Sequence, residues 1–221
     1  MRDRPREIGA ATVSPRPDAR PKNLIERHAR RAARAGVTVV PQATRIRRGG
    51  LCGDSGLRGV LAAPIRGTRP GCGLVGGVHV QTVEDVVLSP PAAMDCATAR
   101  ALANWVRGGL KPAVGKHGGG VSEISVAGHY VCRTRNHRPG APISEHGRGR
   151  AIDISAIRLE NGAELRVLGG WRDPNVGPIL KQAHRAACGV FGTVLGPNAD
   201  RFHRDHFHFD TARHRNGAYC R

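Results

Sequence analysis

The sequence of 221 residues is poor in aromatic side chains, in acidic side chains and in long apolar runs. Phe, Trp and Tyr make up 4% of it, and only 17 Asp and Glu accompany 35 Lys and Arg. No stretch is long enough to span a membrane, and no apolar segment follows a basic start, so we expect neither a transmembrane helix nor an ordinary secretory signal. Basic residues are not interleaved with aromatic ones, which argues against a nucleic-acid-binding surface despite the net charge of +18.

The first 50 residues carry half of this positive charge. They hold 13 Lys and Arg against 4 Asp and Glu, are rich in Arg, Pro and Ala, and show no strand-like alternation. This composition predicts a basic, disordered arm over residues 1–50. Within the arm, LIERHARRAARAG at 24–36 could instead form a short basic helix that binds nucleic acid or an anionic membrane surface.

The cysteines are dispersed, and none forms a CxxC pair, which weakens a zinc-cluster interpretation. All six follow the arm, at Cys52, Cys72, Cys96, Cys132, Cys188 and Cys220. An even number of dispersed cysteines predicts three disulfides in an oxidising compartment, with their pairing left open. The alternative is six free thiols in a cytosolic protein, which the missing secretory signal supports. A translation start placed too far downstream would remove such a signal without changing the fold.

Residues 51–221 are expected to form one domain, with a loop-rich first part at 51–94. Apolar spacing predicts two helices: one begins after an N-cap at Asp95, covers 96–106 and is ended by Gly108-Gly109, and the other covers about 178–190. Alternating or β-branched segments predict strands at 73–83, 121–133, 151–155, 157–159, 164–168 and 206–210, with a turn at Asn161-Gly162. Helices and mainly antiparallel strands without regular βαβ alternation predict an α+β fold.

The segment HRDHFHFD near the end of the chain has the strongest chemical pattern. Side chains two apart on a strand share a face, so His206, His208 and Asp210 should point one way. Phe207 and Phe209 should point the other way, into the core. Two imidazoles on one face predict a metal site if further ligands come from elsewhere in the chain.

A histidine and an aspartate in SEHGRGRAID, His146 and Asp153, could supply those ligands. Zinc in catalytic sites commonly takes three protein ligands and a water, whose pKa it lowers to about 7, so such a site predicts hydrolysis. The competing interpretation of His146 and Asp153 is a surface ion pair.

These segments resemble known metallopeptidases. SEHGRGRAID fits the pattern SxHxxGxAxD of the D-Ala-D-Ala metallopeptidases, and HFH fits the HxH motif of the wider group that includes lysostaphin and the hedgehog signalling domain. The run from Cys52 to Cys220 resembles the extensin-like C-terminal domain of bacterial proteins, with its YVCR, SEHGRGRAIDI, FGTVLGP and HRDHFHFD segments. The resemblance implies a hedgehog/D-Ala-D-Ala-peptidase-like fold, a mainly antiparallel sheet with flanking helices, that contains a metal.

The resemblance also implies roles for particular residues. His146, Asp153 and His208 resemble the three zinc ligands. Asp205 stands where related carboxypeptidases have a glutamate that takes a proton from the attacking water, but its side chain is one methylene shorter and needs a bend in the strand to face the metal. His206 resembles a non-ligand imidazole that stabilises the oxyanion or moves the proton.

Arg133 resembles an arginine that binds substrate carboxylate or developing negative charge, and Arg135 could replace it. We expect Asp210 to support a ligand histidine rather than to bind metal. The other polar residues near the motifs are expected to have structural or surface roles: Ser144 caps or braces its loop, His129 packs, and His203 and His214 lie on the surface.

The resemblance therefore implies a zinc-dependent peptidase or amidase that acts on peptidoglycan peptides, in the periplasm or secreted. The basic arm would suit anionic wall polymers or a membrane surface. The alternative is a catalytically inactive, zinc-stabilised module that binds cell wall or protein, which the Asp in place of the usual Glu at Asp205 favours.

Overall fold

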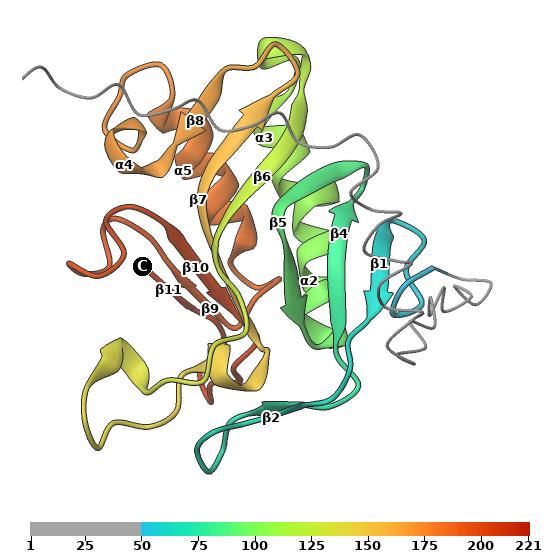
Figure 1. Cartoon of the computed structure of the whole chain (residues 1–221). Coiled ribbons are helices and arrows are strands. Elements are labelled where there is room, and N and C mark those ends of the chain that lie inside the picture. Colours follow the sequence, from blue (N-terminus) through green and yellow to red (C-terminus); the bar gives the residue numbers. More distant parts are fainter. Residues whose placement is uncertain (1–49) are drawn as a thin grey trace, which may run out of the picture. The chain divides into compact units, whose positions relative to one another are not determined.

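A nine-stranded sheet runs through the part of the chain that the computed structural model describes, residues 50–221 (Figure 1). Its strands are β1 (Leu57–Leu61), β4 (Val78–Val83), β5 (Val86–Met94), β6 (Val121–Gly128), β7 (Ala151–Leu159), β8 (Glu164–Arg166), β9 (Thr193–Leu195), β10 (Phe207–Asp210) and β11 (Tyr219–Cys220). The order across the sheet is β1-β4-β5-β6-β7-β10-β9-β11, and β8 pairs with β7. All pairs are antiparallel except β5–β6 and β9–β11. The expected α+β class with a mainly antiparallel sheet is confirmed.

The basic arm, with its candidate helix at 24–36, lies outside the described residues. Within residues 50–221, no helix has both the length and the apolar character that crossing a membrane requires. Strands β1, β4 and β5 lie in the segment 51–94 that we expected to be loop-rich. The same segment contributes a small separate hairpin, β2 (Ile65–Arg66) with β3 (Gly73–Leu74).

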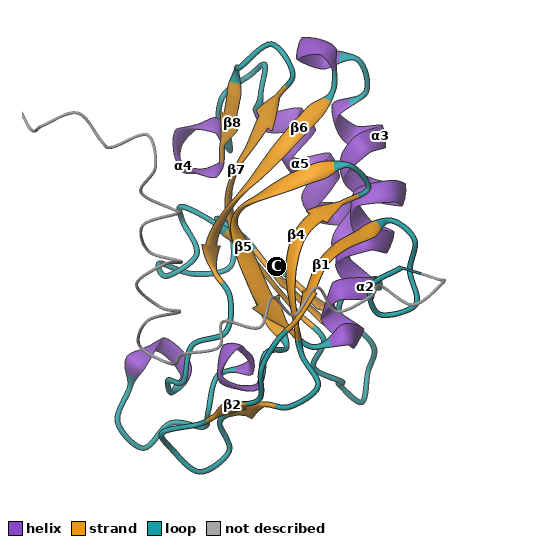
Figure 2. Ribbon diagram, turned by 45° about the vertical axis from the view of Figure 1, so that its right-hand side comes forward, coloured by secondary structure: helices purple, strands orange, loops and turns teal. Residues whose placement is uncertain are grey.

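Helices cover one side of the sheet, as Figure 2 shows for α2, α3 and α5. They are α2 (Cys96–Trp105), the π-helix η1 (Val106–Leu110), α3 (Lys111–Val114) and α5 (Gly177–Ala187), and shorter turns form η2 (His117–Gly119), η3 (Arg135–His137), η4 (Glu145–Arg148) and α4 (Val167–Gly170). Asp95 caps α2 as predicted, because its carboxylate accepts the N–H of Thr98 at 2.7 Å. The second predicted helix forms, but it ends at Ala187.

A cluster of aromatic rings lies in the otherwise mainly aliphatic core between helices and sheet. Phe207 and Phe209 of β10 are fully buried, and Phe209 packs edge-on against Trp105 of α2 with centroids 5.1 Å apart. The indole N–H of Trp105 donates to the carbonyl of Ala183 in α5 at 2.8 Å. The phenylalanines therefore mark the helix side of β10, and the alternate residues of this strand point to the opposite side.

The prediction that Gly108-Gly109 ends the first helix is wrong. The chain continues through both glycines as η1 and then as α3. A Cβ added at Gly109 would lie 2.8 Å from Cβ of Ala186 in α5 and 3.0 Å from Cδ1 of Trp105. Close helix packing therefore requires glycine here, and this packing outweighs the poor helix propensity of glycine.

Two strand predictions also need correction. The segments 151–155 and 157–159 form one continuous strand, β7, which pairs with β6 on one side and with β10 and β8 on the other. The strand expected at 121–133 ends at Gly128, and the residues that follow form a loop. The predicted turn at Asn161-Gly162 does join β7 to β8, with the Asn161 side chain accepting the N–H of Ala163 at 3.0 Å.

All six cysteines form disulfides, as predicted. The pairs are Cys52–Cys96, Cys72–Cys132 and Cys188–Cys220. They are compatible with an oxidising compartment outside the cytoplasm.

Candidate metal centre

His146 is positioned by a short turn that ends at a glycine. It lies in η4, and Gly149 closes this turn in the left-handed conformation, with φ of 67°. Residues other than glycine rarely adopt this conformation, and a Cβ at Gly149 would also lie 2.6 Å from the Leu74 side chain. The chain then enters β7, so that His146 and Asp153 meet although they are seven residues apart. The side chain of His146 is 0% exposed.

Asp153 and His208 face each other directly across the β7–β10 pair. His208 Nδ1 lies 2.8 Å from Asp153 Oδ1, and His146 Nε2 lies 3.1 Å from the same oxygen and 3.2 Å from His208 Nδ1. The three residues that we predicted as metal ligands therefore present one donor atom each to a common point.

The outer nitrogens of both histidines are bound to acceptors. His146 Nδ1 lies 2.8 Å from the carbonyl oxygen of His129, and His208 Nε2 lies 3.0 Å from Asp210 Oδ2. Carbonyl and carboxylate oxygens only accept, so each of these nitrogens carries the hydrogen. In the neutral rings, His146 Nε2 and His208 Nδ1 then both point lone pairs at Asp153 Oδ1. Three electron-rich atoms in contact fit a cation between them.

The donor set and its spacing suit a first-row metal ion. Two imidazole nitrogens and one carboxylate oxygen are ligands that zinc takes. Ligand atoms bound tetrahedrally at about 2.0–2.1 Å from zinc are about 3.3 Å apart, close to the 2.8 to 3.2 Å between these atoms. His146, Asp153 and His208 could therefore hold zinc with one position left open.

Neighbouring groups hold these ligands in place. Asp210 supports His208 from the same face of β10, as expected, and its Oδ1 accepts the N–H of Ala212 at 2.9 Å. Gly128 lies opposite Asp153 on β6, where a Cβ would approach Asp153 Oδ2 to 2.6 Å. The absence of a side chain at Gly128 therefore makes room for the Asp153 carboxylate.

Burial and hydrogen bonding act in opposite directions on the pKa values of the cluster. Burial alone would raise the pKa of the Asp153 carboxyl, but the hydrogen bonds with His146 and His208 outweigh it and lower that pKa below its ordinary value. Burial lowers the pKa of His208, but the hydrogen bonds with Asp153 and Asp210 raise it to about 9. Without a metal, the two carboxylates therefore favour a positive charge between them, and a protonated His208 ring provides it.

The two residues expected to manage a proton form a pair at the edge of the cluster. The predicted bend is present, since Asp205 lies in a turn before β10, but its side chain is 65% exposed and does not face the ligands. Instead, Asp205 Oδ1 accepts a hydrogen bond from His206 Nδ1 at 2.8 Å. His206 Nε2 then points inward and lies 3.8 Å from Asp153 Oδ1.

A hollow of about 410 Å³ opens beside the cluster, and His208 and Asp210 line it together with Arg133 and Arg135. The prediction that Arg133 continues a strand is wrong, because it lies in the loop after β6. Arg135 also lies 3.9 Å from Glu145 Oε1, so its charge is partly shared. Both arginines are thus placed to meet a negatively charged group in the hollow.

The remaining motif residues have varied positions. Ser144 braces the loop through its backbone, since its N–H donates to Arg133 and its carbonyl accepts from Gly147. His214 bonds the Thr193 hydroxyl at 2.9 Å. His129 contributes its carbonyl to the site, and burial lowers the pKa of its ring.

His203 was expected on the surface, and this prediction is wrong. Its side chain is 12% exposed, it lines the hollow, and its ring centroid lies 5.7 Å from that of His208. Asp200 holds His203 Nδ1 at 2.8 Å. The only sequence signal for this residue is its spacing of three and five residues from His206 and His208.

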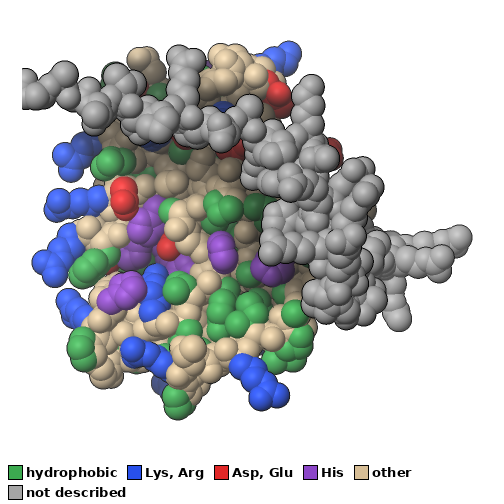
Figure 3. Space-filling model, in the orientation of Figure 1, with side chains coloured by type: hydrophobic (Ala, Val, Ile, Leu, Met, Phe, Trp, Pro, Cys, Tyr) green, Lys and Arg blue, Asp and Glu red, His purple; other side chains and the backbone are tan. Residues whose placement is uncertain are grey.

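Histidines gather in the middle of the face seen in Figure 3, with Lys and Arg around its left and lower edges. This face therefore presents imidazoles beside two edges of positive charge. Such a surface suits a ligand with negatively charged groups.

Comparison with known proteins gives one result. A search of the curated proteins and a search of the solved structures found no match. The model of the family described as extensin-like protein C-terminus matches residues 55–221, a range that contains the whole of the candidate metal centre. The chain therefore belongs to the extensin-like protein C-terminus family.

Proposed function

We propose that the protein is a zinc-dependent peptidase or amidase that acts on bacterial cell-wall peptides. One observation carries this proposal: donor atoms of His146, Asp153 and His208 lie within 4.8 Å of one another. In the neutral rings the N–H groups of the two histidines are bound elsewhere, so the other nitrogen of each ring offers its lone pair to a cation.

Bound zinc would supply Lewis-acid activation of water and of the scissile carbonyl. Residues of the chain would transfer the proton and bind the negative charge of the substrate. His206, oriented by Asp205, has its Nε2 at the edge of the cluster and would accept or return the proton there. Arg133 and Arg135, which line the same hollow, would bind negative charge on the substrate or on the carbonyl oxygen.

The substrate class rests on the motif pattern and on the compartment. SEHGRGRAID and HFH resemble the motifs of peptidases that cut bacterial cell-wall peptides. Three disulfides fit a periplasmic or secreted protein, where this substrate is found. The basic residues 1–50 would bind anionic wall polymers or a membrane surface.

A second candidate function is a zinc-stabilised module that binds cell wall or protein without cleaving it. The position of Asp205 favours this alternative, because its carboxylate points to His206 and to solvent rather than to the cluster. If the protein does cleave its substrate, His206 and not Asp205 is the residue placed to transfer the proton.

The first test is metal content by mass spectrometry. We expect one zinc per chain in the wild type and none in His146→Ala or His208→Ala. The matched control is His117→Ala, which removes an exposed histidine in η2 and should retain the zinc. Wild-type protein without bound metal, after refolding in zinc, would overturn the proposal.

The second test separates the two candidate functions. We expect the zinc-loaded wild type to hydrolyse muropeptides, and His206→Gln to lower kcat by about 10²- to 10⁴-fold while zinc content stays at one per chain. Zinc-loaded wild type that binds muropeptides but never cleaves them would instead establish the binding module.

A further inference from the structure

A second cavity, separate from the cluster, has a volume of about 650 Å³. Three arginines line it: Arg172, just after α4, and Arg201 and Arg204, in the loop before β10. Among residues 50–221, none of the three forms an ion pair within 4.0 Å or a side-chain hydrogen bond. Arg201 lies over the Phe202 ring at 4.9 Å from its centroid, a contact that leaves the N–H groups of Arg201 free, so all three charges are available to a ligand.

The one acidic side chain of the cavity does not neutralise them. Asp200 Oδ1 accepts hydrogen bonds from the backbone N–H of Phe202 at 2.7 Å and from His203 Nδ1 at 2.8 Å. Its oxygen is thus already engaged by its own loop. The lining keeps an excess of positive charge, which favours a ligand with more than one negative group.

The floor of the cavity is packed against the core and is partly apolar. Trp171 packs edge-on against Phe207, with ring centroids 5.7 Å apart, and its indole N–H donates to Asn198 Oδ1 at 3.0 Å. This bond uses the amide oxygen of Asn198 and leaves its N–H groups free to donate. Val167 and Pro197 add to the apolar part. A ligand with carboxylates on an apolar backbone matches such a lining.

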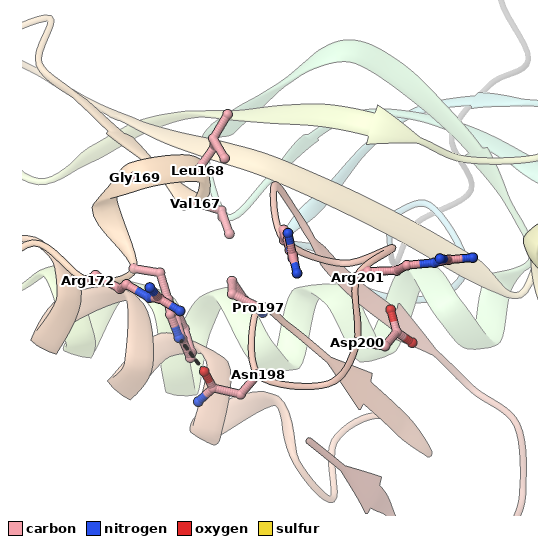
Figure 4. A pocket seen from close by; sticks show the side chains of 10 residues that line it. Val167, Leu168, Gly169, Arg172, Pro197, Asn198, Asp200 and Arg201 are labelled. Atoms are coloured by element: carbon pink, nitrogen blue, oxygen red, sulfur yellow. Dashed lines mark hydrogen bonds between the residues drawn. The ribbon is translucent and has the colours of Figure 1, made fainter.

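The arginines do not converge on one point. Figure 4 shows Arg172 and Arg201 on opposite sides of the space, with Pro197 and Asn198 between them. This spread over the two sides favours two carboxylates on an extended chain over one small anion. Asp200 also lines the hollow beside the metal-ligand cluster, so the two spaces meet at this residue.

We infer that this arginine cavity binds an acidic peptide segment with at least two carboxylates, adjacent to the bond that is cut at the candidate metal centre. The inference deepens the proposed function and rests on it only for the position of the peptide next to a bond that is cut. The binding itself needs neither metal nor turnover. Each arginine contributes a fork of N–H donors that matches a carboxylate.

The test is isothermal titration calorimetry of the full chain with short probes at low salt. The acidic probe is acetyl-Ala-Glu-Ala with a free carboxyl terminus, and the neutral probe is amidated acetyl-Ala-Gln-Ala. We expect binding of the acidic probe only, weakened about three- to tenfold by Arg172→Gln or Arg201→Gln and lost in the double variant. Added salt should weaken binding further.

The matched control is Arg66→Gln, which removes the same charge from exposed strand β2 and should bind as the wild type does. Equal weakening by Arg66→Gln, or equal binding of both probes, would overturn the inference. Inorganic phosphate is the third probe: binding as tight as that of the acidic peptide would show a single-anion site and overturn the peptide assignment.

The metal-site variant His146→Ala separates this inference from the proposed function. We expect it to bind the acidic probe as the wild type does. If this binding persists while zinc-loaded wild type cleaves nothing, the proposed hydrolysis fails and the acidic-peptide site stands. If wild type cleaves muropeptides without binding the acidic probe, the opposite holds.

Discussion

At the scale of single residues, His208 has the most constrained surroundings. Its two ring nitrogens lie 2.8 Å from Asp153 and 3.0 Å from Asp210, so a carboxylate oxygen faces each of them. A doubly protonated ring satisfies both carboxylates, which explains why the pKa of His208 rises to about 9 although burial lowers it. A metal that binds His208 Nδ1 must first displace this proton.

The raised pKa of His208 predicts that the stability of the metal-free protein depends on pH. The folded pKa of about 9 lies above the ordinary 6.5, so the contribution of His208 to stability is complete below pH 6.5 and is lost as pH rises through 9. In the presence of chelator, we expect the free energy of unfolding to fall by on the order of 3 kcal/mol across this window. Urea unfolding at several pH values measures it.

The control is His208→Gln, which should show a flatter pH profile over the same range. Zinc affinity of the wild type should rise with pH across the window, because fewer protons then compete for His208. Identical profiles for wild type and His208→Gln would contradict the assignment of the shift to this histidine.

At the scale of elements, the site depends on three adjacent strands. β7 supplies Asp153, β10 supplies His208, and β6 supplies the space above Asp153 through Gly128. On β10 itself, Phe207 and Phe209 fix the strand against the helices, so the opposite face is held rigidly toward the site.

Filling the space on β6 should displace the carboxylate. In Gly128→Ala, the added methyl group would lie 2.6 Å from Asp153 Oδ2, so the carboxylate must move away from the other ligands. We expect zinc affinity to fall about 10- to 100-fold, as measured by competition with a chromophoric chelator.

The matched control is Gly108→Ala in η1, where an added Cβ has nothing within 4 Å. It should leave zinc affinity unchanged and keep or raise stability, since alanine has the higher helix propensity. A wild-type affinity in Gly128→Ala would show that the carboxylate has room to move.

Local pattern was enough to predict part of this arrangement. The N-cap at Asp95, the alternation along 207–210 and the meeting of His146, Asp153 and His208 depend on residues close in sequence or on a specific motif. The passage of the helix through Gly108 and Gly109 depends on contact with α5, which no local pattern contains. The inward position of His203 and the arginine cavity likewise depend on how distant loops pack.

At the scale of the whole described domain, the disulfides have unequal relations to the site. Cys72–Cys132 joins the β2–β3 hairpin to the loop after β6, and a Cβ at Gly147 in η4 would lie 3.0 Å from Cys72 Sγ. Cys52–Cys96 instead joins the segment before β1 to the first residue of α2. The first bridge therefore supports the turn that carries His146, and the second does not.

Removing each bridge should separate these effects. The spanned segments of 60 and 44 residues are similar, so replacing either pair by alanine should cost about 4 kcal/mol of stability. We expect only the Cys72→Ala/Cys132→Ala variant to lose zinc affinity as well, when both variants are compared under conditions that keep them folded. Thermal unfolding and zinc competition give the two quantities, and equal losses of affinity would contradict the separate roles.

The two tryptophans of the chain give it a built-in pair of optical reporters. Trp105 is fully buried between helices and sheet, so its fluorescence should change only when the core opens. Trp171 lies in the floor of the arginine cavity, so its emission should respond to an occupant there while the protein stays folded. Replacing one or the other by phenylalanine would let unfolding and occupancy be followed as separate signals, without any added dye.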